Sequence, residues 1–595
     1  MNTSQKTPSI KTVPLRELLT LLVPIFKRYR LRIFAGLTAL LGVDLLQLLI
    51  PRVIKQGVDG LAERSLDQGM LLQLAGLIIL LGIIVAVLRF TWRYLIIGFS
   101  RILEKKLRDQ IVAHILKMEA PFFERYTTGD LMAHSSNDMT SIQMACGMGL
   151  VAATDAFLLS TAAIAFMMYI NPGLTLFALL PMPFLAICTR VLSGQLHRRF
   201  TTVQEQFSLL TEFVRSALVS IRLLKANTME SFQNARFDTL GRKYVRSNLK
   251  VALIQGLIVP IATLAGGLGM LLVLYFGGRL VITEVITIGD FAAFISYLAM
   301  LVWPMMAMGW VINLIQRGRT SLQRIYKIIE SQPALPQGQH CPETAASEAQ
   351  LAIRNLTFSY PAATTPALQE ITTTFGAGLH GITGRAGSGK STLCRLLTRL
   401  YPVEDGTILF NECDVNLLSP SYLRTQLSYV SQEPVLFSSS IAENIALGNP
   451  EASQETIEKY AKIAAIHEDI QGFPEGYQTR IGERGVKLSG GQKQRLALAR
   501  ALLCETPLLI IDDGLSAVDV ATEHAILEKL SQSLSAKTVL VVSNRVKLLS
   551  MAQRILVFEE GRIIHDASHR ELITQSALYR SMYEKQMRNE EEAPA

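Results

Sequence analysis

Long apolar runs fill the first half of the chain, and polar stretches of unequal length separate them. A helix needs about 20 mostly apolar residues to cross a bilayer. Six stretches fit this length: 33–54, 71–90 extending to 97, 146–170, 174–188 with its flanks, 251–276 and 291–314. The fourth is the shortest and contains Pro181 and Pro183, which membrane helices tolerate as kinks. The pattern predicts an α-helical transmembrane domain of six spans over residues 31–330.

The polar stretches indicate how these spans are oriented. The second gap (100–144) and the fourth gap (190–250) are long, charged and helix-patterned, whereas the other three are short. Lys and Arg gather in these two gaps and in residues 1–30, and such residues favour the cytoplasmic side. We therefore expect both termini and both long gaps in the cytoplasm of a plasma (inner) membrane protein. Residues 1–30 form a cytoplasmic segment without the apolar core and cleavage site of a signal peptide.

The residue composition and the hydrophobic pattern of the chain change after residue 330. Residues 331–350 are rich in Pro, Ser and Gly, a composition typical of a linker. From Leu351 onward, short apolar strands alternate with helical stretches and Gly-rich turns. This alternation predicts an α/β domain over residues 351–595, built on a mostly parallel sheet with covering helices.

Composition agrees with a membrane half and a soluble half. Of the 595 residues, 49% are hydrophobic and only 18% are charged, below the quarter that soluble domains usually carry. The net charge of +9 is what cytoplasmic loops of a membrane protein collect, so lipids are expected partners and nucleic acid is not. Six scattered cysteines without a CxxC pair argue against a disulfide scaffold and a zinc site.

A phosphate-binding loop stands at the start of the α/β domain. The sequence GRAGSGKS at 384–391 fits GxxxxGK[ST], follows a short apolar strand and opens a helix. Its backbone N–H groups are expected to face phosphates, Lys390 to reach the β- and γ-oxygens, and Ser391 to ligate Mg²⁺. The candidate phosphate contacts of this P-loop are Gly384, Gly387, Ser388, Gly389, Lys390, Ser391 and Thr392.

A second motif lies about 120 residues further on. The stretch LLIIDD at 508–513 is an apolar strand that ends in acidic residues. Many buried strands end in Asp, but the order and distance after the P-loop make this a Walker B pattern. Asp512 is expected to hold Mg²⁺ through its hydration shell.

A third motif, LSGGQ at 488–492, lies between the other two. It resembles the signature of ATP-binding cassette (ABC) proteins. In that family two cassettes close head to tail around two ATP molecules, and each signature faces the γ-phosphate bound by the opposite cassette. The resemblance assigns this role to donors at a helix N-terminus, namely Ser489, Gly490, Gly491 and Gln492.

Other family elements match one at a time. Tyr360 looks like the aromatic residue that stacks on adenine, and Gln432 looks like the Q-loop glutamine that touches Mg²⁺ and the membrane domain. Residues 479–485 resemble the exporter X-loop, and residues 516–519 resemble the D-loop. Six spans and one cassette resemble an exporter half-transporter of the MdlA/BmrC type, in which residues 121–131 and 227–237 stand where the coupling helices are placed.

Two positions depart from the family pattern. Asp513 stands where the family usually has the Glu that orients the attacking water. Its carboxylate lies about 1.5 Å further back, because Asp is one methylene shorter, and a misplacement of about 1 Å can slow a reaction about 100-fold. Asn544 stands where the family has the switch His. An amide can donate a hydrogen bond to the γ-phosphate but cannot become cationic.

These departures predict a site that binds ATP and hydrolyses it slowly, beside an intact signature that completes a competent site on a partner chain. We therefore expect one subunit of a heterodimeric ATP-driven exporter that moves amphipathic, drug-like or lipid-like compounds out of the cytoplasm or inner leaflet. Two alternatives stay open. One is a homodimeric exporter or lipid flippase with slow Asp-based hydrolysis. The other is a nucleotide-sensing regulatory subunit without transport.

The predicted spans also contain polar and aromatic residues whose roles stay open: Asp44, Arg89, Arg93, Asp155, Trp303 and Trp310. A charge inside a membrane is a functional candidate because leaving it in lipid costs at least about 2.5 kcal/mol. The two aspartates fit a substrate cavity or a helix–helix contact. The two arginines, one turn apart, also fit the outer water interface. The two tryptophans fit a cavity wall or ordinary packing.

Overall fold

The computed structural model describes residues 13–336, 338, 348–361, 363–482, 487–533 and 537–591. The chain divides into two compact units. The first, here called the helical unit, consists of residues up to Leu116 together with Thr128–Ser331. The second, called the sheet unit, consists of Lys117–Thr127 and the residues from Gln332 onward. Each unit is described by itself below.

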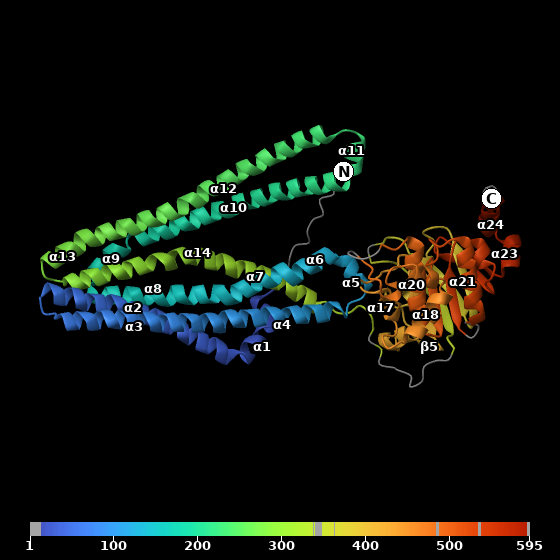
Figure 1. Ribbon diagram of the computed structural model, residues 1–595, viewed down its shortest axis with the longest axis horizontal. Helices are drawn as coiled ribbons and strands as arrows, with labels where there is room; N and C mark the ends of the chain where they lie inside the picture. The colour runs from blue at the N-terminus through green and yellow to red at the C-terminus, as the bar shows by residue number, and fades with distance from the viewer. Residues whose placement is uncertain are drawn as a thin grey trace. The chain divides into compact units, whose positions relative to one another are not determined.

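The helical unit is built from long helices, several of which continue through a single π-helical turn (Figure 1). In chain order these are α1 (Leu15–Arg28), α2 (Arg30–Ala62), α3 (Gln68–Trp92), η1 (Arg93–Ile97), α4 (Gly98–Ile115), α6 (Thr128–Ala133), η2 (His134–Asp138), α7 (Met139–Met144), η3 (Ala145–Gly149), α8 (Leu150–Ile170), α9 (Pro172–Leu179), α10 (Pro181–Val219), α11 (Ile221–Ala226), α12 (Glu230–Leu272), η4 (Val273–Gly277), α13 (Gly278–Ile282) and α14 (Ile288–Glu330).

Five helices in the described part of the chain are long and apolar enough to cross a membrane: Arg30–Ala62, Gln68–Ile115, Thr128–Ile170, Glu230–Ile282 and Ile288–Glu330. They correspond to five of the six predicted spans. The predicted fourth span falls on a shorter apolar helix, Pro172–Phe184, which is interrupted at Leu180 between α9 and α10. Pro181 has no N–H to donate to the preceding turn, so the regular helix is broken there.

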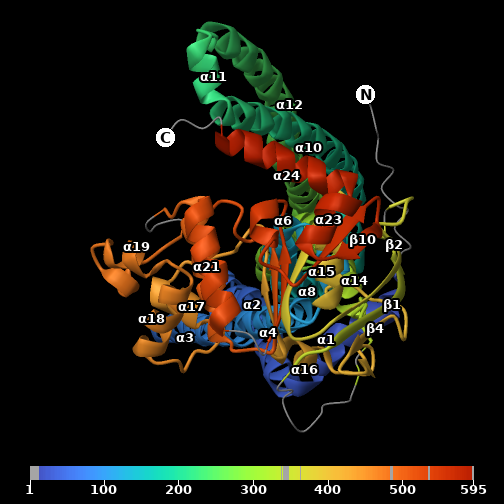
Figure 2. The same ribbon diagram turned by 90° about the vertical axis from the view of Figure 1, so that its right-hand side faces the viewer.

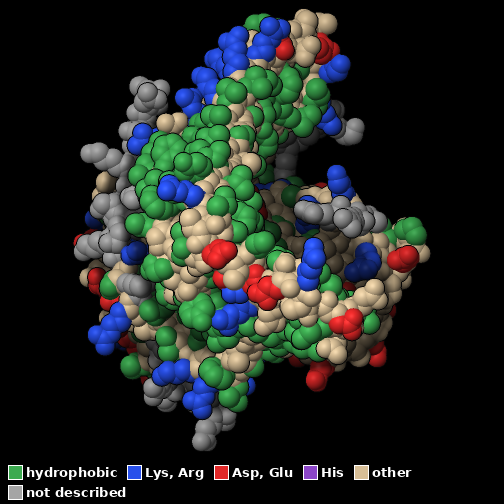
Figure 3. Space-filling model, turned by 90° about the vertical axis from the view of Figure 1, so that its left-hand side faces the viewer, with side chains coloured by type: hydrophobic (Ala, Val, Ile, Leu, Met, Phe, Trp, Pro, Cys, Tyr) green, Lys and Arg blue, Asp and Glu red, His purple; other side chains and the backbone are tan. Residues whose placement is uncertain are grey.

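Helices α2, α3, α8 and α14 pack along one another, whereas α10 and α12 form a separate long pair that leads to α11 (Figure 1). Hydrophobic side chains cover much of this surface, and Lys and Arg gather towards one end of the α10–α12 pair (Figure 3). The second coupling helix was predicted at 227–237. In the structure residues 227–229 form the turn between α11 and α12, with Thr228 at φ +53°, and the rest of this range begins α12.

Contacts between α2 and α14 fix one end of the helical unit. Asp59, near the end of α2, accepts hydrogen bonds from the Thr287 hydroxyl at 2.9 Å and from the Gly289 N–H at 2.7 Å. Lys55 Nζ lies 2.5 Å from Oδ1 of Asp290. The loop between α2 and α3 therefore lies at the same end of the unit as the start of α14.

The sheet unit contains two sheets. Its strands are β1 (Leu351–Phe358), β2 (Leu368–Phe375), β3 (Gly378–Gly384), β4 (Ile408–Phe410), β5 (Cys413–Asp414), β6 (Leu427–Val430), β7 (Leu508–Asp512), β8 (Thr538–Val542), β9 (Arg554–Glu559) and β10 (Arg562–Ala567). The four-stranded sheet is antiparallel in the order β2-β1-β4-β5. The larger sheet has the order β10-β9-β3-β8-β7-β6 and is parallel except at β10.

Short helices complete the sheet unit: α5 (Ala120–Arg125), α15 (Lys390–Leu397), α16 (Pro420–Thr425), α17 (Ile441–Ala446), α18 (Gln454–Ile463), α19 (His467–Gln471), η5 (Gly476–Gln478), α20 (Gly490–Leu503), α21 (Val520–Ser533), α22 (Val546–Leu549), α23 (His569–Gln575) and α24 (Ala577–Glu591). Within this unit α17, α18 and α19 lie to one side of the larger sheet, and β1, β2 and β4 lie to the other (Figure 2).

The central strands β3, β7 and β8 are buried along their whole length. Strands β7 and β8 are accordingly almost entirely apolar, as expected for strands covered on both faces, whereas β3 also contains His380 and Thr383. The register places Ile382 of β3 and Asp512 of β7 on either side of Val542 of β8. The loops that follow these three parallel strands therefore meet at one edge of the sheet, where open α/β folds bind ligands.

Candidate nucleotide site

The P-loop connects β3 to α15 in a backbone conformation that requires glycine. Gly384 has φ +146° and Gly389 has φ +99°, in a region that residues with a Cβ rarely adopt. A Cβ on Gly389 would lie 2.6 Å from the carbonyl oxygen of Ala367, and one on Gly384 would collide with the carbonyl oxygen of Phe558. The sequence Gly-x-x-x-x-Gly is thus required by both conformation and space.

Lys390 is buried inside this loop. Its Nζ donates hydrogen bonds to the carbonyl oxygens of Gly384 at 2.7 Å and Arg385 at 2.8 Å. Burial lowers the pKa of Lys390 below its ordinary value, although the nearby Asp513 and Asp512 act in the opposite direction. The predicted loop residues Gly387, Ser388 and Thr392 lie in the same turn and the start of α15. This nest of backbone N–H groups around one ammonium fits a polyphosphate.

Ser391 and Asp512, the two residues predicted to share a Mg²⁺ ion, meet at the strand edge. The Ser391 hydroxyl donates to Oδ1 of Asp512 at 2.8 Å, and the Tyr429 hydroxyl donates to Oδ2 at 3.0 Å. Within the described residues no group of three or more His, Cys, Asp or Glu could hold a metal ion. A hydroxyl and one carboxylate nevertheless fit Mg²⁺, which takes few protein ligands and completes its shell with phosphate oxygens and water.

Asp513 follows directly and is half-buried. Its backbone has φ +52°, and its N–H donates to the carbonyl oxygen of Val542 at 3.0 Å. Its carboxylate accepts a hydrogen bond of 3.3 Å from Nε2 of Gln432. Burial and the adjacent Asp512 raise the pKa of Asp513, while Lys390 and Arg545 lower it less strongly. The structure therefore brings together three of the predicted site residues, Lys390, Gln432 and Asp513.

Asn544 lies in the exposed loop after β8. Its carbonyl oxygen accepts a hydrogen bond of 2.7 Å from Nε2 of Gln586 in α24. The next residue, Arg545, donates to the carbonyl oxygens of Ser516 at 2.8 Å and Val518 at 2.9 Å and forms an ion pair with the buried Glu523. The predicted D-loop is thus tied to the loop that carries Asn544. Sequence analysis assigned no role to Arg545, which follows the switch position, and did not single out Glu523.

Tyr360 is held beside the P-loop helix. Its hydroxyl lies 3.1 Å from that of Thr392, and its ring meets that of Tyr401 edge-on at 5.2 Å. The Tyr401 hydroxyl in turn donates to the carboxylate of Glu124 in α5. Tyr360, the predicted adenine-stacking residue, is therefore connected to the first predicted coupling helix through its ring contact with Tyr401 and the hydrogen bond from Tyr401 to Glu124. The contact between Tyr401 and Glu124 was not predicted, because it joins residues far apart in the sequence.

The signature residues open helix α20. Ser489 caps this helix: its hydroxyl accepts from the Gln492 N–H at 3.2 Å, and the Gln492 side chain accepts from the Ser489 N–H at 3.0 Å. A Cβ on Gly491 would lie 2.8 Å from the carbonyl oxygen of Ala517, so the D-loop approaches this glycine closely. Ser489 and Gly490 are exposed, and in the described part of the chain no hydrogen bond joins Ser489, Gly490, Gly491 or Gln492 to the P-loop.

The predicted X-loop is only partly visible. Ser440 and Arg480 form an isolated antiparallel bridge, and Gly482 has φ +118°. Residues 483–486, including Glu483, Arg484 and Gly485, lie outside the described residues, as do parts of the predicted linker at 337 and 339–347.

Comparison with known proteins places both units in one family. Residues 33–305 match the ABC transporter transmembrane region, and residues 368–516 match the ABC transporter family of ATP-binding domains. The chain is 37% identical to the multidrug resistance-like ATP-binding protein MdlA of Escherichia coli, over 94% of this chain and 95% of MdlA. It is 32% identical to the probable multidrug resistance ABC transporter ATP-binding/permease protein YheI of Bacillus subtilis, over 94% and 96%.

The fold agrees with a solved exporter. The structure of a bacterial Atm1-family ABC exporter with ATP bound superimposes with a TM-score of 0.77 at 25% identity, covering 94% of this chain and 99% of that one. The predicted fold class, multi-pass membrane location and cytoplasmic ATP-binding domain are thereby confirmed. The chain therefore belongs to the ABC transporter family, as an exporter half-transporter that joins a helical membrane region and an ATP-binding region in one polypeptide.

Proposed function

We propose that this half-transporter is one subunit of a heterodimeric exporter and that its own Walker motifs form a slow ATP site. Its partner is a second half-transporter chain, and its cargo is an amphipathic, drug-like or lipid-like compound from the cytoplasm or inner leaflet. The single observation that carries the proposal is Asp513, a short carboxylate that stands after Walker B with the non-basic Asn544 on the neighbouring loop.

The nucleotide-binding elements support a site that still binds ATP but hydrolyses it slowly. Lys390 and the positive-φ glycines fit the phosphates, and Tyr360 stands beside α15 where an adenine could stack. Ser391 and Asp512 would hold Mg²⁺, with Gln432 nearby. When bound, Mg²⁺ neutralises charge on the phosphates and favours attack at the γ-phosphate. What this site lacks is the longer carboxylate and the cation-forming imidazole that the family uses to position and activate water.

The signature supports a role on a second cassette. Ser489 is exposed and capped into a regular helix of 14 residues, so the positive end of that helix is available to an anion outside this chain's own P-loop. In this proposal the chain contributes its intact signature to a competent ATP site on the partner chain, whereas its own Walker motifs form the slow ATP site. ATP bound between them supplies the differential affinity for the closed state that drives the conformational cycle.

ATPase assays on purified proteins test the proposal. This chain alone, a candidate partner half-transporter alone and the co-expressed pair are compared in nanodiscs. We expect brisk turnover only in the pair. Brisk turnover by this chain alone, abolished by Asp513→Asn, would replace the proposal with a homodimeric exporter. ATP binding in the pair without ATP-dependent uptake of any cargo into inside-out vesicles would favour a nucleotide-sensing regulatory subunit.

A further inference from the structure

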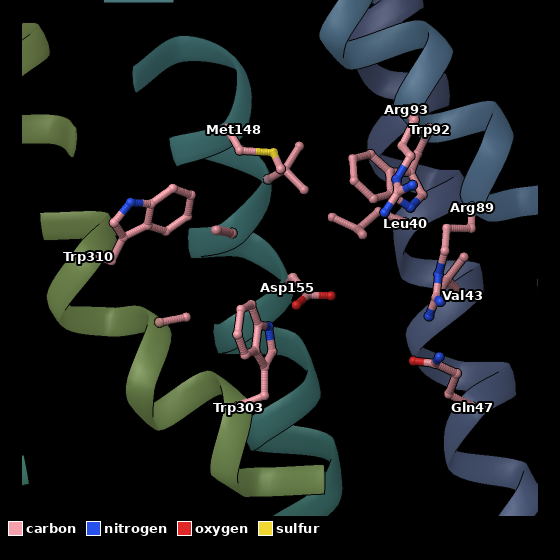
Figure 4. Close-up of a pocket in the computed structure, with 13 residues that line it drawn as sticks. Leu40, Val43, Gln47, Arg89, Trp92, Arg93, Met148, Asp155, Trp303 and Trp310 are labelled. Atoms are coloured by element: carbon pink, nitrogen blue, oxygen red, sulfur yellow. The ribbon is translucent and has the colours of Figure 1, made fainter. Parts of the chain in front are cut away.

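The helical unit contains a cavity of about 480 Å³ lined by α2, α3, α8 and α14, with η1 and η3 (Figure 4). It belongs entirely to the membrane region and is separate from the nucleotide site. Four charged or amide-bearing side chains and three tryptophans line it, together with smaller apolar residues. A space of this size and composition is typical of small-molecule sites, which combine apolar walls with a few polar groups that fix orientation.

One wall of the cavity is aromatic. Trp303 and Trp310 stand seven residues apart on α14, which places both on the same face of the helix, and their side chains are 64% and 44% exposed. Trp92 of α3 lies on the other side. These are all the tryptophans in the chain. The aromatic rings offer a large contact area to an apolar body.

The opposite wall is cationic. Arg89 of α3 and Arg93 of η1 are one turn apart, and Gln47 of α2 lies beside them (Figure 4). Among the described residues, neither guanidinium lies within ion-pair distance of a carboxylate; that of Arg93 rests 5.6 Å from the ring centre of Trp92. Two like charges one helical turn apart repel each other, and an unpaired Arg at membrane depth is costly. An anion between them would relieve both effects.

Among the described residues, Asp155 is the only acidic one that lines the cavity. Asp44 lies behind the wall, with 1% of its surface exposed, and its carboxyl group interacts electrostatically with both Asp155 and Arg89. The lining itself therefore carries two positive groups and one negative group. The charge balance favours an anionic ligand over a cationic one.

The cavity lies far from the outer end of the membrane region. Arg89 follows the start of α3 by 21 residues, or about 31 Å of helix, and the start of α3 adjoins the loop at the same end as the start of α14. The other end of α14 leads to the cytoplasmic ATP-binding domain. Arg89 and Arg93 therefore do not lie at the outer water interface, which the sequence had left open.

We propose that this cavity binds an amphipathic anion, with a carboxylate, sulfate or phosphate head between Arg89 and Arg93 and an apolar body against Trp303 and Trp310. Guanidinium groups suit such heads because their planar forks donate two parallel hydrogen bonds. That this anion is also the exported cargo rests on the proposed function. That the cavity binds the anion does not depend on the proposed function.

Bromine quenching of tryptophan fluorescence tests the binding, since every tryptophan lines the cavity. The full-length protein in nanodiscs is titrated with a brominated dodecanoate and with the corresponding alcohol and trimethylammonium compounds. We expect saturable quenching that is strongest with the anion. Arg89→Gln and Arg93→Gln should each weaken its binding about tenfold, as expected for the loss of a charge-assisted hydrogen bond. Arg279→Gln, on the exposed α13 outside the cavity, serves as the matched control.

Two further variants keep the test decisive if a glutamine variant does not fold. Arg93→Lys keeps the charge and should retain most of the affinity, whereas Asp155→Asn removes the opposing charge and should tighten anion binding. The proposal would be overturned if the cationic probe quenched more strongly than the anionic probe and if this quenching were lost in Asp155→Asn. It would also be overturned if all three probes quenched equally and no arginine variant changed the quenching, because the probes would then simply partition into an apolar environment.

Uptake into inside-out vesicles separates this inference from the proposed function. If the anion binds but is not taken up in the presence of ATP, the binding site is supported and the export of amphipathic anions is refuted. If the anion is taken up in an ATP-dependent manner and the Arg89 and Arg93 variants do not change this uptake, export is supported and the proposed binding site is refuted.

Discussion

Nε2 of Gln432 lies 3.3 Å from Oδ2 of Asp513. Gln432 comes from the loop after β6 and Asp513 from the end of β7, so the parallel pairing of these strands brings the two side chains together. The Asp513 carboxylate therefore faces the nucleotide site and is held by an amide on one side. Its short side chain, and not its direction, is the feature on which the proposed slow hydrolysis rests.

Lengthening this carboxylate should accelerate the site. In a complex whose other ATP site has been disabled, Asp513→Glu combined with Asn544→His should raise phosphate release by up to about 100-fold, the cost associated with a 1 Å misplacement. Single-turnover phosphate release measures the chemical step directly. Asp513→Asn is the control and should abolish the residual activity. An unchanged rate in the double variant would show that the deficit lies elsewhere.

The pH dependence of turnover at this chain's own ATP site should reflect the raised pKa of Asp513. Its carboxylate must be ionised to orient water, and its pKa lies above the ordinary value of 3.8. The rate should therefore increase with pH through a window above the ordinary aspartate range. Lys390 must remain cationic, and its pKa lies below the ordinary 10.5. The rate should therefore begin to fall at a lower pH than the ordinary lysine pKa would give. A rate that stays constant from the ordinary aspartate pKa to the ordinary lysine pKa would contradict this prediction.

Removal of the P-loop ammonium should separate binding from turnover. Lys390→Ala deletes the group that reaches the phosphates and should weaken ATP binding at this chain's own site by about tenfold, measured with a fluorescent ATP analogue. If the two sites are unequal, the heterodimer should keep part of its turnover. Complete loss of turnover would count against the division of labour. The same substitution in the partner's P-loop is the control and should stop nearly all turnover.

A substitution in the signature should have the opposite effect. Ser489→Arg places a bulky group where the partner's γ-phosphate is expected and should stop nearly all turnover, while ATP still binds at this chain's Walker motifs. Part of any effect is loss of the helix cap, worth about 1 kcal/mol. Ser453→Arg removes an equivalent cap from α18 and should leave turnover intact. An unchanged rate in Ser489→Arg would refute the cross-chain role.

The hydrogen bond from Tyr401 to Glu124 should transmit nucleotide state to the membrane region. Tyr401→Phe removes it while keeping the aromatic contact with Tyr360. We expect basal ATP turnover to persist and cargo stimulation of that turnover to fall by about tenfold, as for the loss of a hydrogen bond to a charged group.

A tyrosine elsewhere in the sheet unit provides the control for this experiment. The Tyr460 hydroxyl donates to the carboxylate of Glu505 in the same manner, but neither residue belongs to α5 or to a nucleotide motif. Tyr460→Phe should leave cargo stimulation unchanged. Equal effects of the Tyr401 and Tyr460 variants would indicate a general loss of stability instead of a specific link.

Much of the architecture was predictable because its causes are local. A run of about 20 apolar residues has few alternatives to a membrane helix, and the P-loop needs glycines where Gly384 and Gly389 adopt positive φ. The fourth span was the least certain, and in the structure its apolar helix is interrupted before Pro181. The turn at 227–229, inside the range predicted for the second coupling helix, was not predicted, since it carries no Gly or Pro to mark it.

The sequence by itself determined the family, the nucleotide motifs and the two departures at Asp513 and Asn544, because these depend on residue identity at fixed spacing. Only the tertiary structure decided that Gln432 reaches Asp513, that Tyr401 reaches Glu124, and that Arg89, Arg93 and three tryptophans enclose one cavity. Each of these contacts joins residues from different helices or strands. Their proximity depends on how those elements pack, which no local pattern in the sequence records.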